Sequence, residues 1–145
     1  MNDAPPGRID LWLASRYENI ELVLALLDRV CRERGIDADT EHWIAMALRE
    51  ALANALKHGT RLDPAKRIWV AFSGGEGEFV AEVGDEGEGF DASGAPDPLA
   101  PENQMKTSGR GIFYMRSFMD EVAHSGGEAG GTVVTLRKKL KAREG

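Results

Sequence analysis

The chain has 145 residues, a formal net charge of −6 and 42% hydrophobic residues. A chain of this length typically forms one domain, and no apolar run approaches the ~20 residues of a membrane span. The negative charge argues against non-specific nucleic-acid binding, and the N-terminus lacks the basic and apolar regions of a signal peptide. The single cysteine, Cys31, excludes an internal disulfide and a thiolate metal cluster. We therefore expect a cytoplasmic protein of one domain.

The first part of the chain predicts a strand followed by a helix. Apolar residues alternate with others from Arg8 to Ser15, which is typical of a strand with one buried face. From Glu18 to Arg34 the apolar residues recur at helical spacing, and Gly35 ends the pattern. Three polar residues then offer N-caps for the next helix: Asp37, Asp39 and Thr40.

The stretch from Glu41 to Gly59 predicts one helix with two distinct faces. One face is a continuous apolar stripe that must pack on a sheet or another helix: Ile44, Leu48, Ala51, Leu52 and Ala55. Glu50 and Asn54, one turn apart, project roughly opposite this stripe. Their own stripe also carries the apolar residues Trp43, Met46 and Ala47. Polar groups on a partly apolar stripe favour a cavity there, and therefore a site.

The second half predicts two pairs of strands separated by a long loop and a short helix. The paired strands are Arg67–Ser73 with Glu78–Asp85, and Glu121–Ser125 with Thr132–Leu140. Between the pairs, residues 85–111 are rich in glycine and proline, and helical spacing resumes from Gly111 to Met119. A loop of this length is usually functional or disordered. The order of elements indicates an α+β fold, a two-layer sandwich with a mixed or antiparallel sheet and helices on one face.

The first candidate site is the helical pair Glu50 and Asn54. An amide oxygen and a carboxylate at this spacing suit Mg²⁺, and the carboxylate can alternatively accept a proton from an attacking hydroxyl or water. Helices often carry Glu and Asn on solvated faces, so the pair alone favours that simpler interpretation.

The second candidate is the Asp85-x-Gly87-x-Gly89 pattern directly after a strand. The glycines permit close approach of a flat ligand, and the aspartate can accept a hydrogen bond from an exocyclic amine such as that of adenine. An acidic turn explains the same pattern equally well.

The third candidate is the glycine-rich segment from Thr107 to Ile112, immediately before a predicted helix. Free backbone N–H groups at a helix start suit a polyphosphate, and Lys106 and Arg110 add positive charge. The segment is not a P-loop, and alone it could be a plain helix entry.

Together these motifs resemble one known family. The chain is similar to the GHKL ATP-binding fold in five features. They are Glu-x-x-x-Asn on a helix, Asp-x-Gly-x-Gly after a strand, a Pro-rich lid at about residues 92–108, Gly-x-Gly opening a helix, and the Gly131–Thr132 strand entry. That superfamily contains gyrase, heat-shock chaperone, histidine kinase and mismatch-repair ATPases. Within it the chain resembles the anti-sigma-factor serine kinases. LDP, PEN and SGRGIFYMRSFMDEV strengthen the match, which spans about Arg8 to Leu140.

The resemblance implies a histidine-kinase-like (Bergerat) fold that binds ATP and Mg²⁺. By this likeness Glu50 is the general base, Asn54 the Mg²⁺ ligand and Asp85 the adenine contact. The remaining nucleotide-binding candidates are Lys57, His58, Gly87, Gly89, Lys106, Thr107, Ser108, Gly109, Arg110, Gly111, Ile112 and Thr132. Two departures bear on nucleotide affinity: Phe90 replaces a smaller aliphatic residue, and the lid is short.

The implied activity is that of a serine/threonine-protein kinase acting on a small anti-anti-sigma (STAS) protein, whose unphosphorylated form releases a sigma factor. The family also suggests a homodimer. We expect no nucleic-acid partner and no membrane association. Two alternatives remain open: a stand-alone histidine-kinase catalytic domain, and an ATP-dependent binding module without chemistry. None of His42, His58 and His124 lies in a setting suited to a phosphoacceptor.

Overall fold

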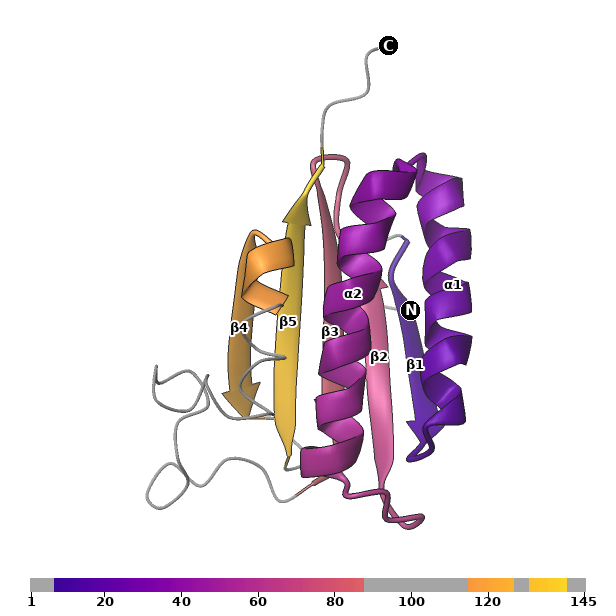
Figure 1. The fold of residues 1–145 in the computed structure, drawn as a ribbon, viewed down its shortest axis with the longest axis vertical. Coiled ribbons are helices and arrows are strands. Elements are labelled where there is room, and N and C mark those ends of the chain that lie inside the picture. Colours follow the sequence, from indigo (N-terminus) through magenta and orange to yellow (C-terminus); the bar gives the residue numbers. More distant parts are fainter. Residues whose placement is uncertain (1–6, 88–114, 127–130, 141–145) are drawn as a thin grey trace, which may run out of the picture.

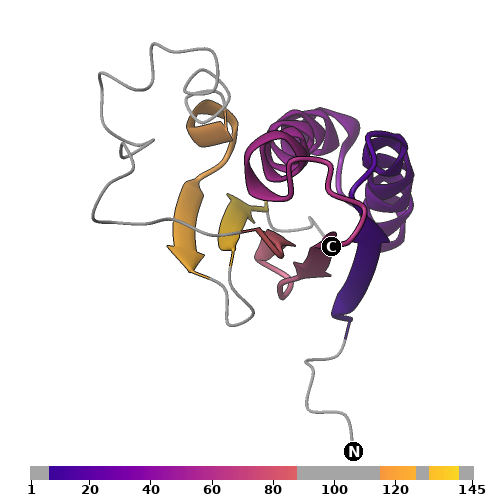
Figure 2. The ribbon, with the colours of Figure 1, turned by 90° about the horizontal axis from the view of Figure 1, so that it is seen from below.

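A computed structural model describes residues 7–87, 115–126 and 131–140, which form a five-stranded sheet with helices on one face (Figures 1 and 2). The strands are β1 (Ile9–Ala14), β2 (Arg67–Ser73), β3 (Glu78–Asp85), β4 (Glu121–Gly126) and β5 (Thr132–Lys139). Their order in the sheet is β1-β2-β3-β5-β4, and every neighbouring pair is antiparallel. The expected α+β sandwich is confirmed, with the antiparallel form of the sheet.

The two long helices begin and end where local chemistry favours it. Helix α1 (Glu18–Arg34) stops at Gly35, whose φ of 68° is in the left-handed region that glycine adopts readily. Helix α2 (Ala38–Asn54) starts earlier than Glu41. Of the three candidate N-caps, Asp37 caps it, because its carboxylate accepts a 2.7 Å hydrogen bond from the Thr40 N–H.

The apolar stripe of α2 packs in the core as expected. Its residues are buried, and Ala47, which we expected on the opposite stripe, is also fully buried. The rest of that second stripe is only partly covered. Trp43 remains 42% exposed and stacks on Phe118, with ring centroids 5.0 Å apart. Phe118 belongs to a helical turn at residues 115–118, whereas the first part of that predicted helix, residues 111–114, lies outside the described residues.

The predicted helix through Gly59 is wrong in its last turn. The α-helix ends at Asn54 and continues as a π-helix, η1 (Ala55–Gly59), in which the Thr60 N–H donates to the Ala55 carbonyl at 2.9 Å. A π-helical turn is wider than an α-helical one and is frequent at functional sites. Here it brings the end of the helix to the end of β3, at the foot of the molecule in Figure 1.

Within the described ranges, no helix is long and apolar enough to cross a membrane.

Candidate functional site

Asp85, the last residue of β3, is the centre of the candidate site. Its side chain is a carboxylate in a place where carboxylates are rare, because the residue is only 6% exposed. Three glycines from three different segments surround it: Gly59 at the end of η1, Gly87 two residues further on, and Gly131 just before β5.

The glycines are required by the space around this carboxylate. A Cβ on Gly59 would lie 2.5 Å from Oδ2 of Asp85, and a Cβ on Gly87 would lie 2.7 Å from Oδ1. A Cβ on Gly131 would lie 2.6 Å from Oδ1, and its φ of 77° independently favours glycine. We call this arrangement the glycine cradle. A larger residue would require a shift of the carboxylate at Gly59, and also of the backbone of Gly59 or Asp85 at Gly87 and Gly131.

Hydrogen bonds fix the carboxylate while burial disfavours its charge. Oδ1 accepts a 2.9 Å hydrogen bond from the Gly87 N–H, and the Thr132 N–H also donates to the side chain. Burial raises the pKa of Asp85, whereas these two N–H groups and the positive charge of Lys66 act to lower it. An oriented carboxylate with a raised pKa in a buried setting is typical of a ligand site.

Glu50 and Asn54 lie on the last two turns of α2, leading into η1. Both are half-buried, and neither side chain has a hydrogen bond or ion pair with a described residue. Their oxygens are therefore available to a ligand. Among the described residues no group of three or more His, Cys, Asp or Glu side chains could hold a metal by itself. A cation at Asn54 would therefore need other oxygen ligands, such as phosphates and water.

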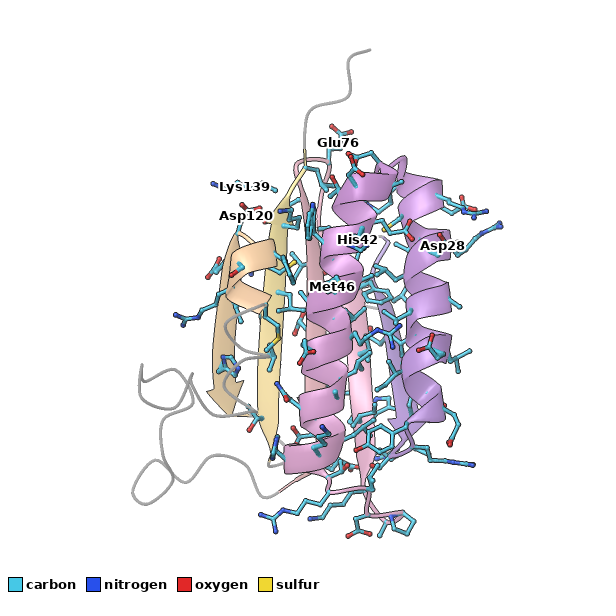
Figure 3. The ribbon with its side chains drawn as sticks, in the orientation of Figure 1. Asp28, His42, Met46, Glu76, Asp120 and Lys139 are labelled. Atoms are coloured by element: carbon cyan, nitrogen blue, oxygen red, sulfur yellow. The ribbon has the colours of Figure 1, made fainter. Side chains whose placement is uncertain are left out.

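The structure brings together only some of the candidate residues. Asp85, Gly87 and Thr132 meet in the cradle, whereas Lys57 and His58 lie on η1 with exposed side chains. His42 lies in the upper half of α2, towards the end away from the foot (Figure 3). The remaining candidates lie outside the described residues: Gly89, Lys106, Thr107, Ser108, Gly109, Arg110, Gly111 and Ile112, together with the expected lid.

Sequence reasoning missed Gly59 and Thr60 as site residues. Gly59 was interpreted only as a helix stop, although a glycine there also permits close approach of another chain segment. Thr60 is 1% exposed, and its hydroxyl has no hydrogen-bond partner in the described part of the chain. A buried hydroxyl without a partner is costly, which indicates that something else satisfies it.

These features fit a purine nucleotide. The cradle offers a buried acceptor at Asp85 with backbone close on three sides, which suits a flat base bearing an exocyclic amine. Glu50 and Asn54, on the adjoining helix, offer oxygens that have no partner among the described residues, and such oxygens suit Mg²⁺ and a reacting hydroxyl.

Comparison with known proteins places the chain in a family. The family described as "Histidine kinase-like ATPase domain" matches residues 13–138. The chain belongs to this family. It is 27% identical over 127 residues to the serine-protein kinase RsbW of Bacillus subtilis, covering 81% of this chain and 79% of the relative. It is 34% identical over 99 residues to the anti-sigma F factor of Halalkalibacterium halodurans, covering 67% of this chain and 68% of the relative.

A solved structure gives the same result. The crystal structure of the RsbU and RsbW domains of Rv1364c from Mycobacterium tuberculosis matches with a TM-score of 0.68 and 26% identity, covering 97% of this chain. The chain spans 35% of the length of that protein chain. The expected resemblance to GHKL ATPases, and within them to the anti-sigma-factor kinases, is confirmed.

Proposed function

We propose that this chain is a serine/threonine-protein kinase of the anti-sigma type, which binds Mg·ATP and phosphorylates a STAS-type anti-anti-sigma protein. The observation that carries the proposal is the buried Asp85 carboxylate inside the glycine cradle. A carboxylate held in this way accepts a hydrogen bond from the exocyclic amine of adenine. Guanine carries a carbonyl oxygen at the same ring position, and this oxygen cannot donate a hydrogen bond. The relatives named serine-protein kinase and anti-sigma F factor support the activity and the partner class.

The phosphate end of the nucleotide would lie against the end of α2. Asn54 would hold Mg²⁺, which would neutralise phosphate charge when bound. Glu50 would accept the proton of the partner's hydroxyl while the oxygen attacks the γ-phosphorus. The bond from the γ-phosphorus to the bridging oxygen breaks, and ADP leaves with the electron pair. Lys57, His58 and the segment 106–112 remain proposed contacts on this side.

Three substitutions separate binding from chemistry. Asn54→Ala and Asp85→Asn should weaken Mg·ATP binding measured by calorimetry, whereas Glu50→Gln should retain binding and lose transfer of labelled phosphate to the STAS protein. General-base removal typically costs 10²–10⁴-fold in rate. Transfer by Glu50→Gln at the parent rate would contradict the assigned role.

The chemical stability of the product distinguishes the alternatives. Phosphoserine and phosphothreonine survive acid, so an acid-labile product would indicate phosphohistidine and a stand-alone histidine-kinase domain. Control of a sigma factor that persists in Glu50→Gln would indicate a binding module without chemistry. We further propose a cytoplasmic homodimer without affinity for nucleic acid, which light scattering and titration with labelled DNA and RNA would check.

A further inference from the structure

The turn that joins η1 to β2 contains two consecutive non-glycine residues in the left-handed region, Arg61 with φ 55° and Leu62 with φ 60°. This conformation is unfavourable for residues with a Cβ, and glycine or asparagine is usual there. The turn also ends the helix, because the Leu62 N–H donates to the Leu56 carbonyl at 3.1 Å. Capping explains the backbone conformation, but it does not explain why arginine and leucine occupy it.

Packing does not explain these two side chains either. Arg61 is exposed, and Leu62 is 41% exposed although it is apolar. The Arg61 guanidinium makes no hydrogen bond or ion pair with any described residue. Most other arginines of the described ranges do form ion pairs: Arg8, Arg16, Arg29, Arg32, Arg49, Arg67 and Arg137. The strained turn therefore exposes an apolar side chain and a cation that has no partner among the described residues, which points to contact with another molecule.

The position of the turn relates it to the candidate site. Only Thr60 separates it in sequence from Gly59, whose backbone lies against Asp85. It also lies beside the start of α1 at the foot of the molecule (Figures 1 and 2). The Ser15 hydroxyl joins the two regions by donating a 2.6 Å hydrogen bond to the Lys66 carbonyl.

We propose that Arg61 and Leu62 form the docking surface for the protein substrate. We call these two residues the foot surface. Its occupant is a protein face that presents a carboxylate to Arg61 and an apolar recess to Leu62. Protein is favoured over nucleic acid, because an exposed leucine gains nothing from a phosphate backbone and the chain carries a net charge of −6. This inference rests on the proposed phosphotransfer, since docking there would hold a hydroxyl-bearing partner next to the nucleotide.

The test uses substitutions that the backbone conformation favours. Arg61→Gly and Leu62→Gly remove the side chains while relieving the left-handed strain, so both variants should fold with a Tm equal to or above that of the parent. The probe is a STAS protein from the same organism. We expect the KM for this protein to rise roughly tenfold or more, the scale of losing one buried anchor contact. We expect kcat and the Kd for ATP to stay unchanged.

A charge reversal provides the matched control. Arg61→Glu should raise the KM for the STAS protein further, whereas Lys139→Glu should not, because Lys139 is exposed at the far end of the sheet (Figure 3). An unchanged KM in Arg61→Gly and Leu62→Gly, with phosphotransfer intact, would overturn the docking surface and leave the proposed kinase standing. Absence of any transfer by the parent chain with ATP bound would overturn both. Binding of single-stranded RNA that Arg61→Glu abolishes would also overturn it, in favour of a nucleic-acid surface.

Discussion

The backbone of Gly59 lies against the carboxylate of Asp85, so that a Cβ on Gly59 would stand 2.5 Å from Oδ2. These residues are far apart in the sequence, and the π-helical turn η1 is what brings them together. The contact joins the helix that carries Glu50 and Asn54 to the strand end that carries Asp85. The two halves of the candidate site therefore meet at this glycine.

Gly59→Ala tests this contact. The added methyl group must displace either the carboxylate or the end of η1, and overpacking of this kind costs about 1–3 kcal/mol. We expect the affinity for ATP to fall at least tenfold, measured by calorimetry. Gly75→Ala is the control, because a Cβ on Gly75 meets nothing within 4 Å and should change neither stability nor binding. Equal ATP affinity in both variants would show that the Gly59 contact has no role in binding.

Asp85→Asn should have opposite effects on stability and on binding. Burial raises the pKa of Asp85 in the folded state above its value in the unfolded chain. The protonated side chain therefore contributes its full stability to the fold below the unfolded pKa, and this contribution is lost as pH rises through the folded pKa. At neutral pH the ionised group is therefore a cost. The ligand-free variant should be more stable than the parent in urea unfolding at neutral pH, and the difference should shrink as pH falls through the acidic range.

ATP binding has its own dependence on the charge of Asp85. The ionised carboxylate is the better acceptor for an amine, so the affinity of the parent should weaken as pH falls through the raised pKa of Asp85. Asp85→Asn should bind ATP more weakly at neutral pH and should not show this acidic transition. A parent affinity that is flat across the acidic range would contradict the role of Asp85 as an ionised acceptor.

The thiol of Cys31 should be unreactive in the native protein. Cys31 is fully buried on α1, and burial raises its pKa to about 12. The thiolate is the reactive form, so a thiol reagent at pH 8 should label the native chain far more slowly than the chain in urea. Rapid stoichiometric labelling without denaturant would show that α1 does not pack as described.

Arg34 should stabilise the end of the fold opposite to the candidate site. Its guanidinium donates to the carbonyl oxygens of Ser73, Gly75 and Glu78, at the hairpin between β2 and β3. Figure 3 labels Glu76 in this hairpin, at the top of the molecule. Arg34→Lys cannot reproduce three donors in a planar fork, so we expect a loss of about 1–3 kcal/mol in urea unfolding.

The same experiment has a matched control and a second readout. Arg29→Lys makes the same substitution in an exposed pair with Glu33 on the same helix and should change stability by less than about 0.5 kcal/mol. The Kd for ATP should be unchanged in both variants. Weakened ATP binding in Arg34→Lys would show that the two ends of the sheet are coupled.

The sequence by itself determined α1, most of α2, the strands and the family. Helical spacing with a glycine stop predicted α1 from Glu18 to Arg34, and alternation around Gly-rich links predicted β2 and β3 with their bounds. These signals are local, because propensity, periodicity and turn chemistry act over a few residues. The motifs around Glu50, Asp85 and Gly131 are also local, which is why they sufficed for the resemblance that the comparisons confirm.

Only the tertiary structure decided how these pieces meet. The sequence allowed a mixed or an antiparallel sheet. The pairing of β1 with β2 and of β5 with β3 made it antiparallel throughout. The sequence predicted an α-helix as far as Gly59. In the structure residues 55–59 form a π-helical turn, which packs against the end of β3. The cradle depends on approaches between residues far apart in the chain, such as Gly59 with Asp85. Such approaches leave no periodic signal, because they follow from how a helix and a strand end pack together.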